Sequence, residues 1–536
     1  MAEKIYLNII WHMHQPYYYD FSKGIFTLPW VRTHATKDYL YMAKLAEKFP
    51  QVHMTFNFTP SLLKQLDLYV QGKTDLVWKH FKKTAKGLSL EEKEYILTQF
   101  SLAPSKIQTR HFPFYENLRE KAKHNFSDLS DQDWLDFQVL YQLLWFDPIT
   151  IKDNPDLNAL IKRGKGYTEE DKTIIQRVTQ QVIAEIIPMY KKLLDKGQIE
   201  TSTSPLYHPI IPLLIDNWIA SESSPGIQLP KYRFQYYQDA QVQIQKAKEV
   251  AERIWETEIR GIWPSEGSVS SATVLCFANH GFSWTATGEE VLFHTLGLPI
   301  VRDQNGLLNH GEKLYQPWFF SQEKKNIVIF FRDRHLSDLI GFAYQHFTSN
   351  EAVKDLISNL ERIMNRLPKD SDPIITIILD GENAWEYYNN NGFDFLSGLY
   401  EALSQHSRII STTPSEYLTQ ARQKSILNGL KPGSWIYGSF NTWIGHEEKN
   451  WAWDQLFLVR KRLDEKEKEL NGERKQEILN ILYQAEGSDW FWWLGSDNPS
   501  LQKEDFRKQF IFLLRTICDA IGEKYPGEGL ECLRMK

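Results

Sequence analysis

Short apolar segments rich in β-branched residues recur along the chain up to about residue 420, and stretches with helical spacing separate them. A nearly continuous apolar run of about four to eight residues is typical of a strand that is buried on both faces. The clearest run, 374–379, is apolar apart from Thr376 and ends at Asp380-Gly381. Further strands are predicted at 5–11, at 51–58, from about 197, around 261–263, at 282–287, at 326–331 and, as a last candidate, at 408–412.

Between about 62 and 193 the apolar residues take helical spacing instead. Ile175, Val178, Val182 and Ile186 lie three or four positions apart, as the buried face of a helix requires. A stretch of this length without strand runs is too long for a loop, so it predicts a helical insertion. A further helix is expected at 241–257.

Alternating strands and helical stretches are typical of a parallel sheet with right-handed crossovers. Seven or so such units predict an α/β fold with a closed or nearly closed barrel, whose strand ends gather on one face. After about residue 420 the strand runs cease, and 453–483 and 506–524 have helical patterns. We therefore expect a catalytic barrel at 1–420 and a helical C-terminal domain at 421–536 that packs on it.

The bulk composition argues against several partners. Lys and Arg number 62 and Asp and Glu 68, a net charge of −6, which disfavours nucleic acid and an anionic membrane surface because both need a basic face. No apolar run approaches the length of a membrane span, and polar residues interrupt the start of the chain, so we expect no signal sequence and a cytoplasmic protein. The cysteines Cys276, Cys518 and Cys532 form no disulfide framework and no metal-type spacing, which fits a reducing compartment.

Aromatic residues make up 14% of the chain, with 18 Trp and 25 Tyr, and rings with polar tips suit sugars. Glu266 and Asp380 each follow a short apolar strand, so both are expected at the carboxyl ends of barrel strands, where this fold places its chemistry. Two carboxylates on either side of a bond are the working groups of glycoside hydrolysis. Each one taken alone could equally cap the helix that follows, and the sequence does not give the carboxylate separation that distinguishes retention from inversion.

His12 and His14 lie one residue apart at the end of the first strand and therefore project to the same side. Three roles are open for them: contact with a sugar, metal ligation, and a satisfied place in the core. Metal ligation would need further donors at other strand ends, for which the chain offers His53, His208, Asp333 and His335. A metal-dependent hydrolase or deacetylase that uses His12 and His14 is therefore the alternative to a glycosidase, and a glycan-binding protein without activity is a third hypothesis.

Five short stretches carry these candidates in order along the chain. They are His14-Gln15-Pro16, Gly197-Gln198-Ile199-Glu200, Trp263-Pro264-Ser265-Glu266, Leu379-Asp380-Gly381-Glu382-Asn383, and the aromatic stretch around Trp443. Together they resemble the five sequence regions of glycoside hydrolase family 57, most closely those of the amylopullulanase and α-amylase-like members. Branching members of that family usually carry a cysteine directly after the third-region glutamate, where this chain has Gly267.

The resemblance implies an incomplete, TIM-like (β/α)7 barrel with a helical insertion, followed by a helical C-terminal domain that contributes to the active-site cleft. It implies retaining hydrolysis of an α-glucan oligosaccharide or polysaccharide, with Glu266 as the nucleophile, Asp380 as the general acid/base, and no metal or other cofactor. Cleavage of α-1,4 linkages is expected; action on α-1,6 linkages, transfer by a 4-α-glucanotransferase or branching enzyme, and the oligomeric state stay open. Positions that line or approach the sugar subsites fall on His12, His14, Glu200, Trp263, Trp385 and Trp443, and Asp333 and His446 are added from their places at a strand end and in the cleft.

The two carboxylates need opposite protonation states. A nucleophile must be ionised, so we expect Arg332 or Arg334 to hold the pKa of Glu266 low. The acid must keep its proton, so we expect the charge of Glu382 to raise the pKa of Asp380. The Trp-rich cluster at 490–493 is predicted to pack in a core more readily than to line a subsite.

Overall fold

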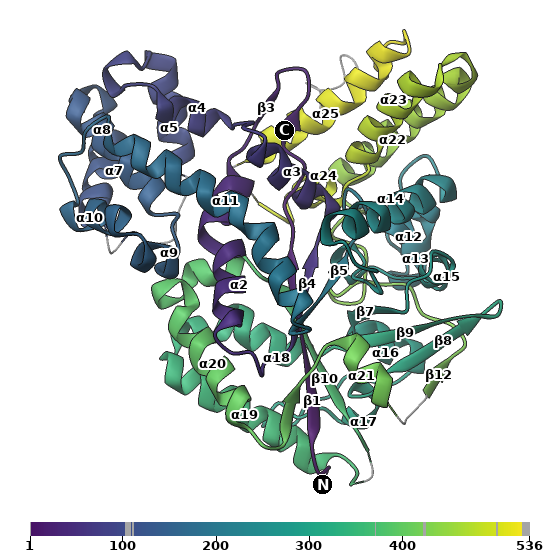
Figure 1. Ribbon diagram of the computed structural model, residues 1–536. Coiled ribbons are helices and arrows are strands. Elements are labelled where there is room, and N and C mark those ends of the chain that lie inside the picture. Colours follow the sequence, from purple (N-terminus) through teal and green to yellow (C-terminus); the bar gives the residue numbers. More distant parts are fainter. Residues whose placement is uncertain are drawn as a thin grey trace.

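Seven parallel strands close into a barrel in the computed structural model (Figure 1), which describes residues 2–101, 109, 112–369, 371–421, 425–499 and 502–527. The strands are β1 (Ile5–Met13), β4 (Met54–Phe58), β5 (Ile199–Thr203), β6 (Gly261–Ile262), β7 (Trp284–Gly288), β9 (Lys325–Arg332) and β10 (Ile374–Asp380). Each pairs with the next along the chain, β10 returns to pair with β1, and a bridge between Thr376 and Arg332 joins β10 to β9. The predicted (β/α)7 barrel is confirmed.

Short strands extend this sheet at two places. β11 (Ile409–Ser411) pairs with the start of β1, where a strand was predicted. β8 (Trp318–Gln322) runs antiparallel to β9, and β12 (Ser425–Leu427) pairs with β8 in parallel. The expectation that strands cease after about residue 420 is therefore wrong for β12. This strand has only three residues and lies at the edge of the sheet with Ile426 exposed, so it leaves no buried apolar run in the sequence. A separate hairpin pairs β2 (Tyr19–Asp20) with β3 (Ile25–Phe26).

The chain after β4 forms the predicted helical insertion. Its helices are α3 (Pro60–Val70), α4 (Leu76–Lys82), α5 (Leu90–Ser101), α7 (Pro113–Asn125), α8 (Asp131–Leu143), α9 (Pro148–Asp153), α10 (Pro155–Arg163) and α11 (Asp171–Asp195). In Figure 1 most of them form a lobe beside the barrel, and the long α11 leads back to β5. Ile175, Val178, Val182 and Ile186 are buried on α11, as their spacing predicts.

Helices also cover the outside of the barrel. Those that precede the insertion or follow it up to β11 are α1 (Trp30–His34), α2 (Leu40–Glu47), α12 (Ile211–Ile215), α13 (Ala220–Ser223), α14 (Tyr237–Trp255), α15 (Ser271–Asn279), α16 (Glu289–Leu296), α17 (Gly311–Leu314), α18 (Arg334–Asp338), α19 (Ser349–Arg366) and α20 (Phe393–Gln405). α14 is the helix predicted at 241–257. Among the described residues, none of the helices combines the length and the apolar character that crossing a bilayer requires.

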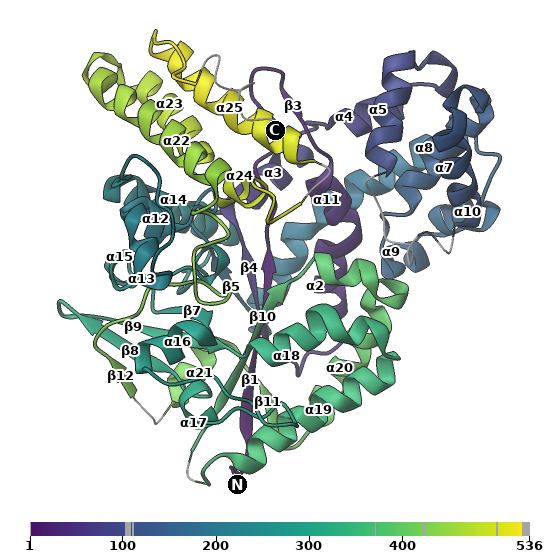
Figure 2. The same ribbon diagram turned by 180° about the vertical axis from the view of Figure 1, so that it is seen from behind.

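The last part of the chain adds α21 (Pro414–Gln420), α22 (Glu447–Lys466), α23 (Gly472–Ala485), α24 (Ser488–Trp492) and α25 (Lys503–Ala520). Figures 1 and 2 show β1 running from the N-terminus at the bottom of the view towards α22 to α25 at the top, so α24 lies beyond the carboxyl ends of the strands. Two of the cysteines, Cys276 and Cys518, are buried thiols, and Cys532 lies outside the described residues.

The barrel interior is a packed core of its own. Its buried side chains include Tyr6, Ile10, Trp263, Trp284, Phe330 and Ile378. Gly261 on β6 has no side chain because the Trp284 ring occupies that space: an added Cβ would lie 2.0 Å from the ring. This close approach positions β6 against β7, directly before the turn that carries Glu266.

We expect Gly261→Ala to destabilise the protein by about 1–3 kcal/mol, because overpacking forces a ring or a strand to move. Urea unfolding followed by tryptophan fluorescence measures the loss. Gly472→Ala is the matched control: it lies in the first turn of α23 with nothing within 4 Å of an added Cβ, so its effect should stay within about 0.5 kcal/mol. Equal stabilities of the two variants would contradict the packing described for Gly261.

Candidate active site

A cavity of about 1080 Å³ opens at the carboxyl ends of the barrel strands, and Glu266, Asp380, His12 and His14 all line it. The strand register explains in part why these side chains lie close together, because His12 on β1 pairs with Asp380 on one side and with Asn57 on the other. The C-terminal region closes the other side with Trp435, Ile436, Tyr437, Asp489, Trp492, Trp493, Gln502 and Phe506. The structure thus brings the two predicted catalytic carboxylates into one cavity.

Glu266 sits in a single helical turn, Ser265–Gly267, that follows β6. Its backbone is left-handed, with φ 56° and ψ 28°, a conformation that costs a residue with a side chain about 1–3 kcal/mol. Hydrogen bonds hold it there: the Trp435 backbone N–H donates to the Glu266 carbonyl at 3.1 Å, and the Thr287 hydroxyl donates to the Gly267 carbonyl at 2.5 Å. The Trp435 indole N–H then donates to the Glu266 carboxyl at 2.9 Å, so one tryptophan fixes both backbone and side chain.

Burial raises the pKa of Glu266 to about 8; the negative charge of Asp380 adds to the rise, and the hydrogen bond from Trp435 opposes it. The predicted arginine partner is wrong. Arg332 donates to the Ile378 carbonyl and pairs with Asp338, while Arg334 pairs with Glu290. Glu266 in the free protein is therefore mostly neutral at pH 7, and it must lose its proton before it can act as a nucleophile.

Glu382, two residues after Asp380, is buried and satisfied by three donors. It accepts hydrogen bonds from the Tyr39 hydroxyl (2.5 Å), the His14 backbone N–H (3.0 Å) and the Gln15 amide (3.2 Å). Burial keeps its pKa well above the usual range. The charge of Asp380 adds to this rise, so the two carboxyl groups repel each other. The expected raising of the Asp380 pKa by Glu382 stays a prediction. The hydrogen bonds of Glu382 also tie the His14-Gln15 segment to the end of β10.

A third histidine, His208, joins His12 and His14. His12 Nδ1 lies 2.7 Å from the Asn57 amide oxygen, and burial lowers the pKa of His12 to about 3, so its ring is neutral. His14 Nε2 lies 2.9 Å from an Asp489 carboxylate oxygen, and the His14 and His208 rings stack with centroids 3.9 Å apart. His208 comes from the irregular loop after β5, where sequence spacing gives no orientation for its side chain.

The other predicted sugar-binding residues do not line the cavity, and their placement does not support direct contact. Glu200 lies on β5, two residues before Ser202, and its carboxyl group accepts hydrogen bonds from the Trp284 indole and from Ser415. Asp333 caps α18 and pairs with Arg302. Three of the predicted residues, Trp263, Trp385 and Trp443, are fully buried and pack one layer behind the cavity. His446 lies in a loop and contacts Ser496.

Three aromatic side chains that the sequence patterns did not single out stand exposed on the cavity wall. Phe342, Tyr387 and Tyr437 expose 69%, 50% and 77% of their surface. Trp492 and Trp493 line the cavity as well, and both are half-buried and pack against the core that holds the buried Trp490 and Phe491, so the predicted packing of the 490–493 cluster is confirmed. Rings gathered on one concave surface indicate a binding site for a ligand with apolar faces.

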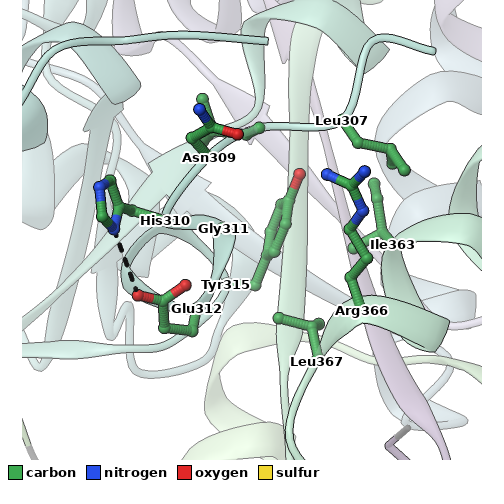
Figure 3. A pocket seen from close by; sticks show the side chains of 10 residues that line it. Leu307, Asn309, His310, Gly311, Glu312, Tyr315, Ile363, Arg366 and Leu367 are labelled. Atoms are coloured by element: carbon green, nitrogen blue, oxygen red, sulfur yellow. Dashed lines mark ion pairs between the residues drawn. The ribbon is translucent and has the colours of Figure 1, made fainter. Parts of the chain in front are cut away.

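A second cavity, of about 200 Å³, lies between the segment 307–315 and the end of α19 (Figure 3). His310 and Glu312 form an ion pair at 3.8 Å on one wall, and Arg366 lies on another. Glu312 is the single carboxylate among its lining residues, and the predicted site residues line the larger cavity or lie near it. The larger cavity is therefore the candidate active site.

Comparison with known proteins decides the family. The model of glycosyl hydrolase family 57 matches residues 8–429. The chain belongs to glycosyl hydrolase family 57. No curated protein sequence matches it.

Solved structures of family 57 and related enzymes share the fold at low identity. A family 57 branching enzyme from Thermococcus kodakaraensis matches with a TM-score of 0.62 and 14% identity, over 96% of this chain and 90% of its own. The α-amylase AmyC from Thermotoga maritima matches with a TM-score of 0.58 and 15% identity, over 97% and 94%. A 4-α-glucanotransferase from Thermococcus litoralis matches with a TM-score of 0.55 and 15% identity, over 96% and 60%.

The raised pKa of Glu266 predicts an unusual pH dependence for this family 57 protein. Near neutral pH the two carboxyl groups together carry one proton, and above about pH 8 both are ionised. If Glu266 and Asp380 have the roles that the sequence predicts, kcat/KM on a neutral glucan should fall about tenfold per pH unit above pH 8, because Asp380 can then no longer donate a proton. Trp435→Phe removes the N–H that stabilises the ionised Glu266 carboxyl, so this falling limb should move to higher pH. The remote, exposed Trp218→Phe should leave the profile unchanged. A profile that already falls above the ordinary glutamate pKa of about 4.3 would contradict the raised pKa of Glu266.

Proposed function

We propose that this protein is a retaining glycoside hydrolase of the α-amylase or amylopullulanase type that acts on α-glucans, mainly at α-1,4 linkages. The observation that carries the proposal is the placement of Glu266 and Asp380 on one cavity bordered by exposed aromatic rings. Glycoside hydrolysis needs two carboxyl groups beside the bond, and a glucan chain offers C–H faces that pack on rings.

Hydrolysis follows in two displacements. Ionised Glu266 attacks the anomeric carbon while protonated Asp380 gives its proton to the departing glycosidic oxygen, which leaves a covalent glucosyl ester on Glu266. Asp380, now ionised, takes a proton from a water molecule as that water attacks the same carbon and releases Glu266. Two inversions at one carbon give overall retention.

Gly267 favours the hydrolase type over the branching type. Its backbone is left-handed, with φ 59°, and an added Cβ would lie 2.9 Å from the Trp263 ring and 3.2 Å from the Trp435 Cβ. A cysteine at this position would therefore displace one of the two tryptophans behind Glu266. Transfer to a sugar acceptor is the second candidate function, because Trp492 and Trp493 on the cavity wall offer rings on which an acceptor could rest.

Glu266→Gln and Asp380→Asn should each lower kcat on amylose by at least about 10³-fold while the fold stays intact. The two variants should differ on an activated substrate. An aryl α-maltoside has a leaving group that needs no protonation, so Asp380→Asn should still form the glycosyl ester, and Glu266→Gln should not. Mass spectrometry of the quenched protein detects the ester, and early NMR spectra of the products report the anomeric configuration.

The control for this pair is Glu185→Gln, an exposed carboxylate on α11, which should keep wild-type turnover. Near-normal activity in either site variant would remove its assigned role. Product analysis by chain length and linkage on amylose and pullulan separates hydrolysis from transfer and α-1,4 from α-1,6 cleavage. Turnover that vanishes after chelator treatment would instead favour the metal-dependent hydrolase that uses His12 and His14.

The exposed rings should act in chain binding and not in the chemical step. Phe342→Ala and Tyr387→Ala each remove a ring contact worth about 1 kcal/mol, so KM for a long glucan should rise about fivefold with little change in kcat. Phe347→Ala is the matched control, because Phe347 is 46% exposed on the same segment but does not line the cavity. An equal effect of all three variants would argue against aromatic subsites at Phe342 and Tyr387.

A further inference from the structure

We propose that His14, His208 and Asp489 form a binding site for a divalent transition-metal ion of the zinc class on the wall of the active-site cavity. The three residues come from the end of β1, the loop after β5 and the start of α24, and one ligand atom from each lies within 4.8 Å of the others. The proposal concerns binding alone. It does not depend on the glucan-cleaving activity, whose steps use no metal.

His208 is the residue that points most directly to a ligand. Its side chain is fully buried, and its Nε2 has no hydrogen-bond partner within the described part of the chain. Buried polar atoms are nearly always paired, so an orphaned imidazole nitrogen that belongs to a three-donor cluster indicates a missing partner.

The surroundings of His208 hold its ring in one orientation. Its backbone is left-handed, with φ 58°, and the Ser488 backbone N–H donates to its carbonyl at 3.0 Å. The Ser488 hydroxyl lies 3.1 Å from His208 Nδ1, so Nε2 is the free nitrogen. Metal-ligating histidines are commonly fixed in this way through their second nitrogen.

His14 and Asp489 complete the set from the side of the cavity. His14 Nε2 lies 2.9 Å from Asp489 Oδ1 and 3.2 Å from Oδ2, while His14 Nδ1 lies 3.3 Å from the Thr59 hydroxyl. Like His208, His14 therefore directs its Nε2 towards the cluster, while its Nδ1 lies beside a hydroxyl oxygen. An ion would replace the proton between His14 and Asp489 and bring the two side chains and His208 to a common centre.

The donor set selects the class of metal. Two imidazole nitrogens and one carboxylate suit zinc, cobalt or nickel, whereas calcium and magnesium prefer oxygen ligands throughout. Three protein ligands leave a further coordination position. Because His14 and Asp489 line the cavity, that position faces the cavity, where water or a sugar hydroxyl can fill it.

The test is a direct binding measurement on the full chain. Protein stripped with a chelator is titrated with Zn²⁺ by isothermal calorimetry, and metal content after dialysis is measured by atomic emission. The wild-type protein should bind one equivalent of Zn²⁺ at this site. Loading with Co²⁺ should give the visible absorption bands of a low-coordinate ion with nitrogen ligands, a readout independent of activity.

Three conservative variants locate the ion. Asp489→Asn, His14→Gln and His208→Asn should each weaken Zn²⁺ binding by at least about tenfold, and asparagine tolerates the left-handed backbone at 208. His53→Gln is the matched control, because His53 forms a similar histidine–carboxylate pair with Glu416 at 2.6 Å without belonging to a three-donor cluster among the described residues; its binding should equal wild type. Circular dichroism checks the fold of each variant.

Absence of a bound equivalent in wild type, or an equivalent that all three variants retain at full affinity, would overturn the proposal. Neither result bears on the glycosidase assignment, because no turnover is measured. Loss of activity in Glu266→Gln and Asp380→Asn together with no metal binding would leave the proposed function in place and remove only this site.

Discussion

The active site depends on keeping the carboxyl group of Glu266 out of bulk water while holding it ready to ionise. Burial and the charge of Asp380 oppose ionisation, and the indole N–H of Trp435 favours it. This donor comes from 169 residues further along the chain, outside the barrel strands. The barrel strands alone would present Glu266 without the hydrogen bond that stabilises its ionised form, so the barrel and the C-terminal region build the candidate active site together.

The same contact also supports a strained backbone. A glutamate in the left-handed region is stable only where its surroundings leave no alternative. Beneath the turn, the Trp284 ring lies over Gly261, and the Trp263 ring packs against the Trp435 ring with their centroids 5.2 Å apart. A rigid aromatic core inside the barrel therefore supports the turn from below, and the Trp435 backbone holds it from above. Positioning of this kind would serve the nucleophile role proposed for Glu266, because a small displacement from the anomeric carbon costs a large factor in rate.

Local patterns predicted the barrel because its longest strands, β1, β9 and β10, contain buried apolar runs. The short strands β5 and β6, with the sequences Ile-Glu-Thr-Ser-Thr and Gly-Ile, give a weaker signal. Local patterns also predicted that Glu266 and Asp380 follow strand ends, and the closed sheet brings both to one cavity. Predictions failed where they used proximity in sequence for proximity in space. Trp263 and Trp385 stand close to the two carboxylates along the chain, yet their side chains point into the cores behind the cavity. Arg332 and Arg334 form ion pairs with Asp338 and Glu290, and no local pattern in the sequence predicts these partners.

The residues that sequence patterns could not predict are those on the part of the cavity wall that a ligand would contact. Phe342 lies in a π-helical turn (Leu339–Ala343), Tyr387 ends a short 3-10 helix (Asn383–Tyr387), and Tyr437 lies in a turn, and all three segments are too short to show a periodic pattern. Asp489 and Trp492 belong to a short helix far along the chain. Glu266 and Asp380 lie at or just after the ends of barrel strands, whereas these rings lie outside the strands. A branching enzyme, an α-amylase and a glucanotransferase share this fold at 14–15% identity. Gly267, where an added Cβ would lie 2.9 Å from the Trp263 ring and 3.2 Å from the Trp435 Cβ, is the point where the C-terminal side of the cavity meets the turn that carries Glu266.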